Sequence, residues 1–71
     1  MKNMYFKRSN GEHILLLENC TEEEAWDAMK KFLDDHNYKS YYTRVWTTPD
    51  SNKHYDVGSY TEFFIYGFID M

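Results

Sequence analysis

Apolar side chains recur at helical spacing between Thr21 and about His36. Four of them fall at positions i, i+4, i+7 and i+8, which places them on one stripe of a helix: Ala25, Met29, Phe32 and Leu33. Thr21 and Glu24 fit a capping box, in which the hydroxyl and the carboxylate each accept a hydrogen bond from a free backbone N–H. The pattern predicts an amphipathic helix over Thr21–His36, and no glycine or proline interrupts it.

The segment before the helix predicts two strands. Met4–Arg8 predicts a short strand, and His13 to about Glu18 is the expected return strand. Asn10-Gly11 between them is a strong hairpin signal. The run Ile14–Leu17 breaks strict alternation, so we expect this strand to be covered on both faces.

The segment after the helix predicts further strands, at Tyr41–Thr48, Lys53–Gly58 and Phe63–Ile69, with a turn at 49–52. A break at Gly58-Ser59 leaves open whether the residues after Lys53 form one bent strand or two. The chain of 71 residues therefore predicts a single α+β domain over residues 1–71. Its elements follow in the order β-β-α-β-β-(β), as a small antiparallel sheet of four or five strands with one helix packed on one face.

The net charge of −4 is unevenly distributed along the chain. Residues 18–35 carry seven acidic side chains against two lysines, whereas residues 1–17 carry three basic side chains against one acidic side chain. Direct nucleic-acid binding usually needs a basic stripe, so we do not expect it here.

One cysteine, Cys20, excludes an internal disulfide and favours a reducing compartment. The start of the chain carries no apolar signal region, and the longest aliphatic run, Ile14–Leu17, is far too short to span a membrane. We therefore expect a cytoplasmic protein with no membrane association.

No pattern in the chain points to catalysis, a metal or a cofactor. His54, Asp56 and Ser59 are the nearest approach to a nucleophilic triad, but no nucleophile elbow or oxyanion loop accompanies them. The residues that commonly bind metals lack ligand spacing: His13, His36, His54 and Cys20. We expect neither enzymatic activity nor a bound cofactor.

Two sets of residues are candidates for partner binding. The first is the acidic face of the predicted helix, formed by Glu22, Glu23, Asp27, Asp34 and Asp35 with Glu24 beside them. The second is a group of aromatic and basic side chains on the predicted strands: Tyr42, Arg44, Trp46, Tyr55 and Tyr60. Neither set requires a partner. Acidic side chains are equally typical of a helix face that only contacts water, and aromatic rings are equally typical of side chains that pack against one another across a thinly covered sheet.

The stretch from Tyr55 to Phe64, preceded by Tyr42-Thr43-Arg44-Val45-Trp46, resembles small proteins from phages and mobile elements of Gram-positive bacteria. The resemblance covers about residues 41–66. Size, acidity and the lack of a catalytic motif also resemble the anti-CRISPR inhibitors of phages, a class that shares an action and no common fold. The resemblance implies the cytoplasm of a bacterial host.

These observations lead to the hypothesis of an inhibitor that binds a host protein, such as a Cas-type nuclease, without chemistry of its own. The acidic helix would occupy a basic nucleic-acid-binding surface, and sheet aromatics would anchor it. One alternative is a sponge for a nucleotide-like small molecule, held on Tyr42, Arg44, Trp46 and Tyr55. Another is a phage accessory protein that associates with itself, for example as a homodimer.

Overall fold

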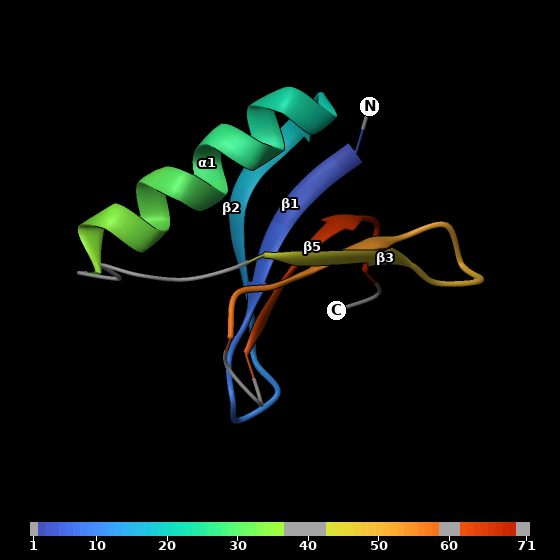
Figure 1. Cartoon of the computed structure of the whole chain (residues 1–71). Coiled ribbons are helices and arrows are strands. Elements are labelled where there is room, and N and C mark those ends of the chain that lie inside the picture. Colours follow the sequence, from blue (N-terminus) through green and yellow to red (C-terminus); the bar gives the residue numbers. More distant parts are fainter. Residues whose placement is uncertain (1, 37–42, 59–61, 70–71) are drawn as a thin grey trace.

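Five strands and one helix form a single sheet-and-helix structure (Figure 1). The computed structural model describes residues 2–36, 43–58 and 62–69. The elements are β1 (Lys2–Lys7), β2 (His13–Cys20), α1 (Glu22–Asp35), β3 (Arg44–Thr47), β4 (Lys53–Asp56) and β5 (Phe63–Gly67). The predicted α+β class is confirmed, and the residues after Lys53 form two strands.

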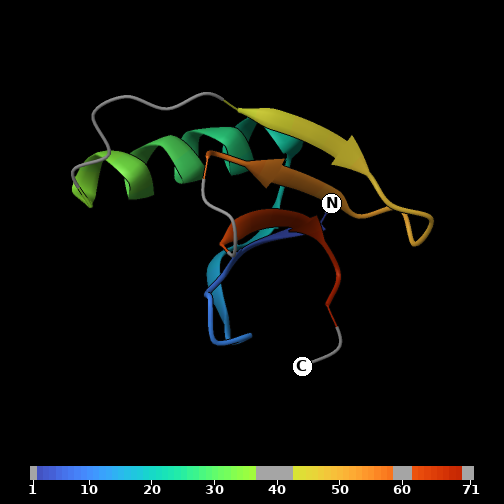
Figure 2. The same cartoon turned by 60° about the horizontal axis from the view of Figure 1, so that its bottom comes forward.

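The sheet has the strand order β2-β1-β5-β4-β3, and every neighbouring pair is antiparallel. The last strand in the chain, β5, therefore lies at the centre, between β1 and β4. Figure 2 shows α1 along one side of the curved sheet, with the turn between β3 and β4 projecting away from the helix. Since α1 packs mainly on β1, β2 and β5, the β3–β4 hairpin is only partly covered.

Helix α1 begins and ends as the sequence predicts. The Thr21 hydroxyl accepts a hydrogen bond from the Glu24 backbone N–H at 3.2 Å, and the Glu24 carboxylate accepts one from the Thr21 N–H at 2.8 Å. At the other end, the His36 backbone N–H donates to the Phe32 carbonyl at 3.1 Å. The capping box is confirmed, and it fixes the residue at which the helix with its acidic first turn begins.

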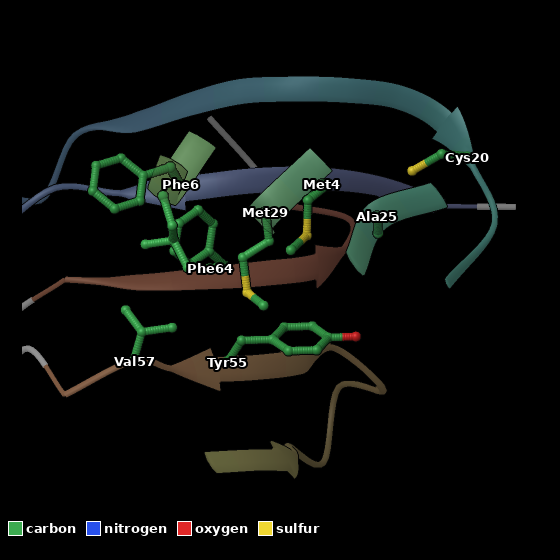
Figure 3. Packing of buried hydrophobic residues seen from close by; sticks show 9 residues of the cluster. Met4, Phe6, Cys20, Ala25, Met29, Tyr55, Val57 and Phe64 are labelled. Atoms are coloured by element: carbon green, nitrogen blue, oxygen red, sulfur yellow. The ribbon is translucent and has the colours of Figure 1, made fainter. Parts of the chain in front are cut away.

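The core lies between α1 and the three central strands (Figure 3). Three side chains of the helix, Ala25, Met29 and Leu33, have at most 1 % of their surface exposed. They face side chains of the sheet that include Met4, Phe6, Tyr55, Val57 and Phe64. The Phe6 ring lies 5.0 Å from the Phe64 ring and 4.6 Å from the Phe32 ring, so an aromatic cluster joins helix to sheet.

The prediction that Ile14–Leu17 would be covered on both faces is wrong. Leu15 and Leu17 keep 44 % and 37 % of their surface exposed. The reason is the place of β2 at an edge of the sheet, where α1 covers only one of its faces. Register shifts around Met4 also place a bulge in the pairing of β1 with β2.

Several strand ends differ from the predicted ones. β2 extends to Cys20, which is the pairing partner of Lys2. β3 begins at Arg44, and the predicted start at Tyr41 lies outside the described residues. β4 ends at Asp56, whose carboxylate accepts a hydrogen bond from the Gly58 backbone N–H at 3.0 Å in a local turn. β5 ends at Gly67, two residues before the predicted end.

Candidate functional site

Three carboxylates stand along the exposed side of α1. Glu23, Asp27 and Asp34 are exposed, and within the described part of the chain they form no ion pair. Their spacing of four and eleven residues from Glu23 keeps them on one stripe of the helix. Lys30 lies on the same stripe, between Asp27 and Asp34, so the negative charge is interrupted once.

The other acids of the predicted face have partners. Glu22 forms an ion pair with Lys53 of β4, and the Glu24 carboxylate belongs to the capping box. Asp35 lies 3.8 Å from the Lys31 ammonium. Fewer acids than the sequence suggested are therefore without an ion pair, because a tertiary ion pair, the helix cap and a local ion pair engage Glu22, Glu24 and Asp35.

Arg44 and Trp46 lie on the sheet face opposite α1. Trp46 stacks on His54 with ring centres 5.4 Å apart and keeps 41 % of its surface exposed. Burial lowers the pKa of His54, so its ring favours the neutral form. The Arg44 guanidinium donates a hydrogen bond to the Asp56 carboxylate at 2.9 Å. This pair and the stacked rings brace the outer hairpin.

Tyr55 differs from the expectation that it would be an exposed anchor. Its neighbours in the pairing place it on the helix side of the sheet, where 2 % of its surface is exposed. Burial raises its pKa to about 12. Tyr42 and Tyr60 lie outside the described residues. The described members of the predicted set thus lie on two faces. Tyr55 pairs with Val45 on the helix side, and the neighbours of Val45 on β3, Arg44 and Trp46, point to the other face.

Asp56 gives the fold a dependence on acid pH. Its hydrogen bond from Arg44, followed by the one from the Gly58 N–H, lowers its pKa. A lowered pKa contributes stability that is present above the unfolded value of about 3.9 and is lost as the pH falls through the lower folded value.

We therefore expect Asp56→Asn to reduce the free energy of unfolding at pH 7. We also expect this free energy to decrease less between pH 5 and pH 2 in the variant than in the unsubstituted protein. Urea unfolding across this range measures both effects. Asp34→Asn is the matched control, since Asp34 is exposed and forms no ion pair among the described residues. Equal pH profiles for the Asp56 variant and the unsubstituted protein would contradict the expectation.

A groove separates α1 from the β3–β4 hairpin, and sequence reasoning missed it. It has a volume of about 360 Å³ and is lined by Glu22, Glu23, Trp26, Val45, Lys53 and Tyr55. Trp26 and Tyr55 meet in it, with ring centres 5.8 Å apart at an angle of 54°. In the sequence, the only related signal is that Trp26 lies at the edge of the apolar stripe of the helix. The groove itself could not be predicted, because it depends on where the β3–β4 hairpin lies relative to α1.

The predicted His54–Asp56 pair does not form, and the described residues assemble no metal-binding cluster. No group of three His, Cys, Asp or Glu side chains in this part of the chain could hold a metal ion. His54 stacks on Trp46 and Asp56 binds Arg44, so the two do not form the pair that a nucleophilic site requires. Ser59, the third member of that candidate set, lies outside the described residues.

Comparisons with known proteins add no relative. A scan against protein-family models, a search of curated proteins and a search of solved structures each found no match. Within the described residues, no helix has the length and apolar character needed to cross a membrane.

Proposed function

We propose that this protein is a non-enzymatic protein-binding module of a phage or mobile element, which inhibits a host defence nuclease. It acts by laying the acidic side of α1 on the nuclease's basic nucleic-acid-binding surface. The observation that supports this proposal is the stripe of three exposed carboxylates without ion pairs, Glu23, Asp27 and Asp34. A solvent-exposed acid without a partner keeps its charge available for a cationic surface.

The geometry of the stripe suits such a surface. At 1.5 Å of rise per residue, the three carboxylates span about 16 Å along the helix axis. One strand of a duplex rises 3.4 Å per phosphate, so this span corresponds to about five nucleotides. The helix keeps the backbone positions of these acids at a regular spacing, and complementary charge speeds association and sets orientation.

The nucleotide-sponge alternative is weakened by two contacts. Arg44 already donates to Asp56, and Tyr55 is buried against the helix, so two of the four side chains proposed to hold the nucleotide are engaged.

One observation supports the self-association alternative. Val45 and Trp46 are 46 % and 41 % exposed on β3, which is an edge strand. Light scattering at high protein concentration separates this alternative from a monomeric inhibitor.

The test uses a panel of purified defence nucleases, including RNA-guided Cas9-type effectors and restriction endonucleases. We expect one of them to bind the protein at low salt, to lose its nucleic-acid cleavage, and to release the protein as salt or competing DNA rises. Absence of binding and inhibition across the panel at low salt would overturn the proposal.

Charge reversal then tests the surface. Asp27→Lys with Asp34→Lys is expected to weaken binding at least tenfold, which corresponds to about 1.4 kcal/mol, and to flatten its salt dependence. Glu12→Lys with Glu18→Lys is the matched control, because it makes the same change in net charge at exposed positions outside α1. Equal losses of affinity for the two variants would mean that the net charge of the protein determines binding and that the acidic side of α1 is not the contact surface.

A further inference from the structure

The groove between α1 and the β3–β4 hairpin has aromatic side chains at its floor and the carboxylates of Glu22 and Glu23 at its rim. Trp26 and Tyr55 supply the floor, and Val45 of β3 forms the far wall. At about 360 Å³, it stands at the small end of the range of about 300–1,000 Å³ for ligand pockets. Its size suits one long side chain.

The rim already holds a cation. The Lys53 ammonium forms an ion pair with Glu22 across the groove, so a cationic side chain fits between the helix and β4. The next acid, Glu23, also lines the groove, is exposed, and has no ion pair among the described residues. The groove thus offers one negative charge more than Lys53 neutralises.

The floor is aromatic. Tyr55 keeps only 2 % of its surface exposed and contributes the inner part of this floor, whereas Trp26 is half-buried and lines the groove with its indole. The Glu23 carboxylate and the indole face together form a set of acceptors.

We infer that this groove is a subsite for one arginine side chain of a partner protein, with the guanidinium against Trp26 and the Glu23 carboxylate. A guanidinium presents five N–H donors in a planar fork, which binds a carboxylate bidentately and stacks on an aromatic ring. Lysine can pair with Glu23 but lacks the plane that stacks on the indole. The identity of the partner's surface as a basic nucleic-acid-binding one rests on the proposed function; the preference of the groove for arginine does not.

The test is a titration of ¹⁵N-labelled protein with two short probes, acetyl-Gly-Arg-Arg-Arg-Gly-amide and its lysine counterpart, followed by NMR. We expect saturable shifts of the Trp26 indole N–H with the arginine probe, which binds at least threefold more tightly than the lysine probe. Shifts confined to Asp27 and Asp34, or equal affinity for the two probes, would overturn the subsite.

Variants locate the contact. Glu23→Gln is expected to weaken binding of the arginine probe at least fivefold, whereas Glu18→Gln, an equal loss of charge at an exposed position of β2, changes it less than twofold. Trp26→Leu should abolish the preference for arginine over lysine while thermal melting shows a folded protein. Equal effects of Glu23→Gln and Glu18→Gln would contradict the groove as the binding site.

The outcomes separate the two proposals. If the nuclease panel fails but the arginine probe binds at Trp26, the subsite stands and the proposed function falls. If a nuclease binds through Asp27 and Asp34 while Glu23→Gln and Trp26→Leu leave its affinity unchanged, the proposed function stands and the subsite falls.

Discussion

Replacing Phe64 with alanine is expected to lower the free energy of unfolding by about 3–5 kcal/mol, the usual cost of removing a large buried ring. Phe64 has no exposed surface, lies on the central strand and contacts both Phe6 and Phe32, with ring centres 5.0 and 5.5 Å away. A chain of 71 residues has a total stability of only about 4–10 kcal/mol. The variant should therefore be largely unfolded at 37 °C.

Urea unfolding followed by circular dichroism measures this effect, and Phe68→Ala provides the matched control. Phe68 is 63 % exposed, so the same chemical change should alter the free energy of unfolding by less than about 0.5 kcal/mol. A similar loss for both variants would mean that the aromatic cluster does not hold helix and sheet together.

Gly67→Ala is expected to cost about 2–4 kcal/mol, because the new methyl group has no room. A Cβ atom at Gly67 would lie 1.8 Å from the Asn52 side-chain oxygen. Asn52 cannot turn away freely, since it accepts from the Phe68 N–H at 3.0 Å and donates to the Phe68 carbonyl at 3.1 Å. The substitution must break these two hydrogen bonds or displace the end of β5.

A double-mutant cycle tests this reason. In an Asn52→Ala background the close oxygen is gone, and we expect Gly67→Ala to cost less than about 1 kcal/mol. The two single substitutions should therefore be strongly non-additive in urea unfolding. Additive costs would show that the Asn52 side chain is not what excludes a larger residue at Gly67.

The helix was predictable because its signals are local. The capping residues Thr21 and Glu24, the apolar stripe and the first-turn acids all act within a few residues of one another. The hairpin at Asn10-Gly11 is equally local. The α+β class followed from the same signals, since a sheet with one apolar face needs one covering helix.

The candidate surfaces were only partly predictable. Composition indicated an acidic helix, and Glu23, Asp27 and Asp34 are exposed as expected. Sequence could not show that Lys53, 31 residues further along the chain, would pair with Glu22. Alternation placed Val45 and Trp46 on opposite faces of their strand but left open which face the helix would cover.

The sequence by itself determined the helix, its caps, its charged side and the class of the fold, because these depend on contacts between near neighbours. Only the tertiary structure decided that β5 takes the central place, that β2 and β3 become edges, and that Tyr55 turns inward. It also created the groove at Trp26, whose walls come from α1, β3 and β4. Such features depend on which distant segments pair, and that choice is made by burial of the whole apolar surface at once.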